Sequence, residues 1–119
     1  MNLAHDSRMS RTRVNQICAT FPGAVVSDPW GGGHDAWKVG GKMFACIGAI
    51  QTGVAVKTDS VETAQMLIDA GVGEKAPYFH RSWIYLPETV DNDELQHRLE
   101  TSYRIIRAGL SKKLQSSLG

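Results

Sequence analysis

The sequence predicts an α+β domain with two layers, in which helices pack against one antiparallel sheet. Three observations indicate this class. Apolar residues flank Gly40-Gly41 on both sides, as they do in a β-hairpin. Two later segments, 59–71 and 91–110, repeat apolar residues every three or four positions, which is typical of amphipathic helices. The chain has 119 residues, enough for one buried core, and its segments read helix, strands, helix, strand, helix.

The composition is that of an ordinary globular protein. Hydrophobic residues make up 42% of the chain and charged residues 21%. No apolar run approaches the ~20 residues that cross a bilayer, and the N-terminus lacks a signal-type apolar stretch, so we expect a cytoplasmic protein without a membrane partner. The net charge of +1 is not that of a dedicated nucleic-acid binder. The oligomeric state is not defined by the sequence, and we favour a monomer.

The first part of the chain predicts a lead-in and a helix. We expect residues 1–9 to be flexible and residues 10–119 to form a single domain. Ser10 fits the N-cap of a first helix, because Val14, Ile17, Cys18 and Phe21 follow at helical spacing. Pro22-Gly23 ends that helix. A short edge strand then covers 24–27, and a glycine-rich turn or loop covers 28–33.

The hairpin around Gly40-Gly41 is the centre of the predicted sheet. Two adjacent glycines supply the positive φ angles of a tight two-residue turn, which fixes the register of its strands. The predicted pairs are Val39 with Lys42, Lys38 with Met43, and Trp37 with Phe44. One face then carries Trp37, Val39, Phe44 and Cys46, and the other carries Ala36, Lys38, Met43, Ala45 and Ile47. A third strand at 54–57 extends the sheet.

Two capping patterns start the later helices. Asp59 with Glu62 predicts the start of a second helix, which Gly71 ends. A connector at 72–77 leads to a strand region at 78–86, in which Trp83 and Tyr85 share one face and Ile84 and Leu86 the other. Asp91 with Glu94 starts a third helix that ends at Gly109. Its apolar stripe consists of Leu95, Leu99, Tyr103, Ile106 and Leu110.

Residue types that commonly carry catalysis or bind metals form no strong pattern. Cys18 and Cys46 lie in apolar runs and predict buried free thiols. The four histidines lack metal-ligand spacing, so we expect no metal and no cofactor. An enzyme at the loop 31–35 would require His34, Asp35 and His80 to converge in one pocket. We expect no catalytic activity and no catalytic residues.

A basic surface is the remaining candidate. Lys38, Lys42, Lys57 and Arg81 come from neighbouring predicted strands and fit weak contacts to DNA phosphates. A second patch consists of Lys112 and Lys113. The alternative is that Trp37 and Trp83 are core residues and that the lysines only keep the sheet soluble.

A different function fits the same stretch of chain. The near-neutral charge and the glycine-rich loop between Trp30 and Trp37 also fit a protein-interaction or small-ligand module without nucleic-acid binding. An exposed tryptophan patch would favour that function over DNA binding.

Three stretches resemble the MmcQ/YjbR family of small bacterial proteins: Trp37-Lys38-Val39-Gly40-Gly41-Lys42-Met43-Phe44-Ala45, Lys75-Ala76-Pro77-Tyr78-Phe79-His80-Arg81-Ser82-Trp83, and the ending from Ser102 to Lys113. The resemblance runs from about residue 10 to the end. It implies a CyaY-like α+β fold and a DNA-binding label that rests on fold analogy. Similarly shaped frataxin-type proteins bind iron through an acidic ridge, but the first helix here carries Arg11 and Arg13, so iron binding does not carry over.

Overall fold

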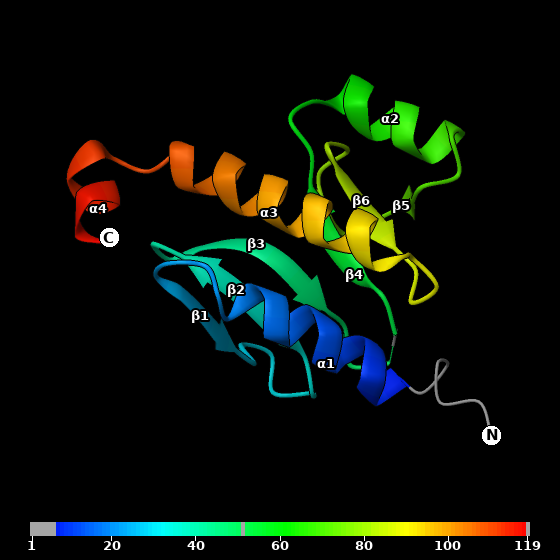
Figure 1. Ribbon diagram of the computed structural model, residues 1–119, viewed down its shortest axis with the longest axis horizontal. Coiled ribbons are helices and arrows are strands. Elements are labelled where there is room, and N and C mark those ends of the chain that lie inside the picture. Colours follow the sequence, from blue (N-terminus) through cyan, green and yellow to red (C-terminus); the bar gives the residue numbers. More distant parts are fainter. Residues whose placement is uncertain (1–6, 51, 119) are drawn as a thin grey trace.

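The computed structural model describes residues 7–50 and 52–118. Its elements in chain order are α1 (Ser7–Cys18), β1 (Ala24–Ser27), β2 (Asp35–Val39), β3 (Lys42–Ile47), β4 (Val54–Lys57), α2 (Val61–Asp69), β5 (Glu74–Lys75), β6 (Trp83–Leu86), α3 (Asn92–Ala108) and α4 (Lys112–Ser117). The strands form one antiparallel sheet in the order β1-β2-β3-β4-β6-β5. Helices α1 and α3 lie along one face of this sheet, and α2 packs beside β5 and β6 (Figure 1). The predicted α+β architecture is confirmed.

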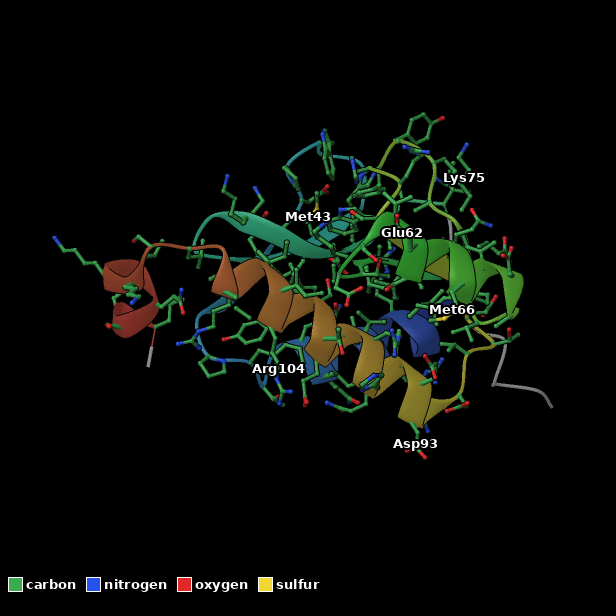
Figure 2. All side chains as sticks on the ribbon, turned by 90° about the horizontal axis from the view of Figure 1, so that it is seen from above. Met43, Glu62, Met66, Lys75, Asp93 and Arg104 are labelled. Atoms are coloured by element: carbon green, nitrogen blue, oxygen red, sulfur yellow. The ribbon has the colours of Figure 1, made fainter. Side chains whose placement is uncertain are left out.

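The core lies between the helices and one face of the sheet. Fully buried side chains from the strands meet those of α3, and the largest are Phe44, Ile47, Ile84, Leu86, Leu95 and Leu99. Both cysteines are buried and free, as the sequence predicts. No helix among the described residues covers the other face of the sheet, which we call the open face. Figure 2 shows Met43 on this side of the sheet, away from Arg104 and Asp93 of α3.

The hairpin register is only partly as predicted. Val39 pairs with Lys42 and Lys38 with Met43, but Trp37 pairs with Ala45 instead of Phe44. Phe44 is the extra residue of a β-bulge, in which two residues of one strand oppose one residue of its neighbour. Because side chains alternate along a strand, one extra residue exchanges the faces of everything that follows.

The bulge therefore corrects the predicted faces of β3. Ala45 and Ile47 join Trp37, Val39 and Phe44 in the core. Cys46, which we placed on the same face as Trp37, Val39 and Phe44, lies on the opposite, open face beside Met43. No turn rule predicts the bulge, because the side chains of α3 determine which residues of β3 are buried.

Ser102 of α3 fills the gap that the bulge leaves between β3 and β4. The ladder between these strands contains only Ala45 with Val56 and Cys46 with Ala55. Beyond it, Ser102 Oγ donates to the Phe44 carbonyl over 2.6 Å and accepts from the Lys57 N–H over 2.9 Å. One buried hydroxyl thus replaces a direct bond between the two strands.

Several predicted boundaries are wrong. Helix α1 includes Ser10, so Ser10 is not its N-cap; no glycine or proline stands before it to stop the helix. Residues 7–9 of the predicted lead-in are helical, and residues 1–6 lie outside the described residues. The N-cap of α2 is Ser60 and not Asp59, because the extended Ser60 backbone lets its Oγ accept the Thr63 N–H.

In the later part of the chain, the prediction of α3 is confirmed, and the predictions for the segments on either side of it are wrong in part. Asp91 caps α3, and Gly109 ends it. The predicted strand region at 78–86 is a strand only from Trp83 onward. Two turns precede it: the Phe79 N–H donates to the Ala76 carbonyl, and the Trp83 N–H donates to the His80 carbonyl. The predicted connector contains the short strand β5, and the sequence did not predict α4.

Candidate functional site

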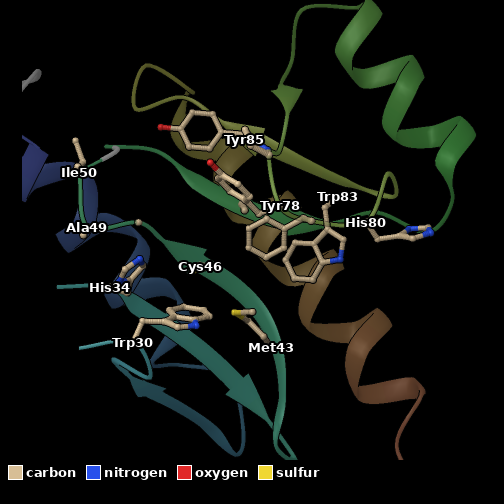
Figure 3. Close-up of a pocket in the computed structure, with 14 residues that line it drawn as sticks. Trp30, His34, Met43, Cys46, Ala49, Ile50, Tyr78, His80, Trp83 and Tyr85 are labelled. Atoms are coloured by element: carbon tan, nitrogen blue, oxygen red, sulfur yellow. The ribbon is translucent and has the colours of Figure 1, made fainter. Parts of the chain in front are cut away.

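A cleft of about 930 Å³ lies on the open face of the sheet (Figure 3). Its volume falls within the range of small-molecule sites. The loops before β2 and before β6 border it, and residues 48–50 after β3 line it as well. Its aromatic residues are Trp30, Tyr78, Phe79, Trp83 and Tyr85.

The floor of the cleft is hollow because small residues lie across the middle strands. Cys46 of β3, Ala55 of β4 and Tyr85 of β6 pair side by side in register, so they share the open face. Neither Cys46 nor Ala55 fills the space above the sheet. The Tyr85 side chain is held in place at the border of the cleft because its hydroxyl accepts the Gly53 N–H over 2.7 Å.

The first border is a loop that Asp28 holds together. The Asp28 carboxylate accepts the backbone N–H groups of Gly32, Gly33 and His34 over 2.8–3.3 Å. These bonds, above all the one from Gly33, lower the pKa of Asp28. The loop carries Trp30, which is 59% exposed, and the Trp30 and His34 rings meet edge to face at 4.9 Å.

The second border is the loop that leads into β6. Tyr78 is fully exposed and has a φ of 73°, a left-handed conformation that is unusual for a bulky residue. The next residue, Phe79, stacks on Trp83 with ring centroids 4.7 Å apart. The loop therefore holds the Tyr78 ring in solvent and the Phe79 ring against Trp83 of β6; Figure 3 labels Tyr78 and Trp83.

Near β6, His80 lines the cleft, and two polar groups from outside the lining, Lys57 and Ser82, lie next to it. Lys57 Nζ donates to Ser82 Oγ over 2.6 Å, and Ser82 Oγ lies 2.9 Å from His80 Nδ1. The Ser82 N–H also donates to His80 Nδ1. Ser82 is only 3% exposed, so its hydroxyl lies beneath the surface.

The residues required for the enzyme hypothesis do not converge. His34 and His80 both border the cleft but stand at opposite ends of it (Figure 3). Asp35 is on the helix side, where its carboxylate accepts from Arg11 over 2.8 Å and from Asn15 over 3.1 Å. Burial, followed by the charge of Asp35, raises the pKa of the Cys46 thiol. Among the described residues, no group of three His, Cys, Asp or Glu side chains could hold a metal ion.

The six basic residues that we predicted do not form one patch. Lys38 shares the open face with Met43, and Lys57 shares it with Trp83. Lys42 is exposed at the hairpin tip, and Arg81 is exposed in the loop before β6. Lys112 and Lys113 begin α4, which packs by the hairpin tip, at the other end of the molecule from β6 (Figure 1).

Other basic residues hold elements together. Arg11 donates to Asp35 and to the Gly48 carbonyl, which ties α1 to the sheet. Arg13 donates to the Val90 and Glu88 carbonyls before α3. Arg104 pairs with Glu100 one helical turn away, although no acidic residue follows it in the sequence.

The tryptophans divide between core and cleft. Trp37 is buried, as one of our alternatives predicts, and its Nε1 donates to Asn15. Trp83 is half-buried on the open face, and Trp30 is exposed.

Sequence reasoning missed the loop that carries Tyr78 and Phe79, because we assigned this aromatic run to a strand. Pro77 before Tyr78 was the available signal for a turn.

Comparison with known proteins supports the fold. The model of the YjbR family matches residues 19–105, which is more than half of the chain. A crystal structure of Deinococcus radiodurans protein DR2400, with the family-model domain DUF419, is similar with a TM-score of 0.79 and 20% identity, over 89% of this chain and 85% of that one. No curated protein matches the sequence. Among the described helices, none has both the length and the apolar character to cross a membrane. The match over most of the domain shows that the chain belongs to the YjbR family.

Proposed function

We propose that this protein is a non-enzymatic binding module whose cleft takes a small molecule with a flat apolar group. One observation carries the proposal. Large apolar side chains that are strongly exposed are few in the described structure, and three of them, Trp30, Ile50 and Tyr78, border this one cleft. Exposed apolar residues that gather around a hollow are typical of a binding site.

Three further features support binding without catalysis. The stacked rings of Phe79 and Trp83 form an aromatic wall beside the small floor residues Cys46 and Ala55, which suits a planar ring. The strained φ of Tyr78 maintains an exposed ring at the rim, and such strain tends to occur at ligand sites. The separated histidines and the buried hydroxyl of Ser82 supply no open pair of acid and base.

The test uses the neutral dye N-phenyl-1-naphthylamine, whose fluorescence rises in an apolar site. We expect saturable binding to the wild type and about three- to tenfold weaker binding to Tyr78→Gly, because a rim contact is lost. Glycine suits a φ of 73°, so this variant keeps the fold and gains stability by about 1 kcal/mol.

The matched control is Met66→Ala, which removes an exposed apolar side chain from α2, away from the cleft lining. This variant should bind the dye as the wild type does. Equal losses in both variants, or no saturable binding to the wild type, would contradict the proposal.

Weak DNA binding is a second candidate. It is favoured by the six basic residues, none of which forms an ion pair with another part of the described chain. Fluorescence anisotropy with a labelled duplex across a salt series tests it. A phosphate-driven mode predicts a log–log slope of about −0.9 per phosphate, and loss of binding in the double variant Lys38→Glu/Lys42→Glu. Absence of binding at low salt would refute this candidate.

A further inference from the structure

We infer that the ligand of the cleft is a small aromatic acid, whose ring lies against the wall formed by Phe79 and Trp83 and whose anionic group binds Lys57 and His80. This inference rests on the proposed function of the cleft and adds the charge of its ligand. Its main observation is a half-buried lysine, without a carboxylate partner among the described residues, that lies directly beside two residues of the cleft lining: Lys57 pairs with Trp83, and its Nζ shares Ser82 Oγ with His80.

Lys57 is positioned by the sheet itself. It pairs with Trp83 in the register of β4 and β6, so both side chains leave the sheet on the open face. Its ammonium group has three donors, and Ser82 Oγ is the one acceptor that it reaches among the described residues. A partly desolvated ammonium group without a counterion is unfavourable, and an anion in the cleft would relieve that cost.

His80 presents a second donor beside Lys57. Its Nδ1 lies 3.1 Å from the Ser82 backbone N–H, which can only donate, so Nδ1 is the acceptor. In the neutral ring the proton is therefore on Nε2, which is free to donate to a ligand oxygen. His80 belongs to the lining of the cleft, whereas the Ser82 hydroxyl is buried beneath it.

None of the carboxylates around the cleft forms an ion pair with Lys57 in the described part of the chain. Asp28 accepts three backbone N–H groups of its own loop, and Asp35 faces Arg11 on the helix side. Glu74 of β5 pairs with Tyr85 and so shares the open face, but it is exposed and forms no ion pair within the described part of the chain. The cleft therefore combines an aromatic wall with two adjacent donors, which is complementary to a ring that carries a carboxylate, sulfonate or phosphate.

Two dyes with the same ring skeleton separate the charge from the ring. N-phenyl-1-naphthylamine is neutral, and 1-anilinonaphthalene-8-sulfonate carries one negative charge. We expect the wild type to bind the sulfonate about five- to tenfold more tightly than the neutral dye. In Lys57→Met this preference should vanish while the neutral dye binds as before. Lys113→Met removes an exposed lysine from α4 and should keep the preference.

The outcomes distinguish the two proposals. Two results would overturn the aromatic-acid inference and leave the cleft proposal intact. In the first, the wild type binds the neutral dye but shows no preference for the sulfonate. In the second, Lys57→Met prefers the sulfonate as strongly as the wild type does. No binding of either dye would overturn both. A measurement without variants covers the case in which Lys57→Met does not fold: 2-naphthoate should displace the neutral dye at about fivefold lower concentration than 2-naphthalenemethanol does. Equal displacement would refute the inference.

Discussion

The hydroxyl of Ser102 offers a quantitative test of how this sheet is held together. It is fully buried, and it joins the Phe44 carbonyl to the Lys57 N–H at the bulge. Ser102→Ala removes both partners at once, and the alanine methyl group cannot replace them. Each buried backbone group left without a partner costs about 1–3 kcal/mol, so for the two groups we expect a loss of about 2–6 kcal/mol in the free energy of unfolding. This is a large share of the ~5–15 kcal/mol that stabilises a typical domain.

Urea unfolding followed by circular dichroism measures this loss. Thr101→Ala is the control, because Thr101 neighbours Ser102 on α3 and its hydroxyl has no hydrogen bond among the described residues. The control should change the free energy of unfolding by less than about 0.5 kcal/mol. A loss for Ser102→Ala no larger than that of the control would refute the idea that this hydroxyl joins the two strands.

Two further predictions concern backbone positions. Gly40→Ala should destabilise the protein by about 1 kcal/mol more than Gly41→Ala in urea unfolding. Both glycines have positive φ, but a Cβ on Gly40 would lie 2.5 Å from Leu110 Cδ1, whereas one on Gly41 meets nothing within 4 Å; equal losses would contradict this. Asp28→Asn should lower the urea midpoint at pH 6, and the difference from the wild type should shrink as the pH falls toward 3. The reason is that the folded-state pKa of Asp28 is lowered, so its contribution is present above the unfolded pKa of about 3.9 and is lost as the pH falls through the folded value. A difference that stays constant with pH would argue against this role.

Local patterns in the sequence predicted the elements that local interactions form. Gly40-Gly41 defined the hairpin turn and its first two pairs, because a two-residue loop leaves little freedom of register. Asp91 and the apolar stripe behind it defined α3, because capping and helical spacing act within a few residues. The alternation in β6 placed Trp83 and Tyr85 together on one face, as the structure confirms.

The candidate site was less predictable. Lysines on adjacent strands are visible in the sequence, but which of them share a face depends on which side of the sheet the helices cover. The cleft also depends on the loop that carries Tyr78. The sequence did not predict this loop, because its run of aromatic residues is typical of a strand. The contact between Lys57, Ser82 and His80 joins β4 to a loop more than twenty residues away, and no spacing rule links those positions.

The sequence by itself determined the α+β class, the central hairpin, the two capped helices and the buried thiols, because these follow from turn chemistry, periodicity and hydrophobicity within short segments. Only the tertiary structure decided the bulge at Phe44, and with it which face receives Cys46. The physical reason is that burial against α3 acts on side chains distant in sequence, and a shift of one residue exchanges the two faces of a strand. The cleft exists because that exchange, together with the loops around it, leaves small residues uncovered on the open face.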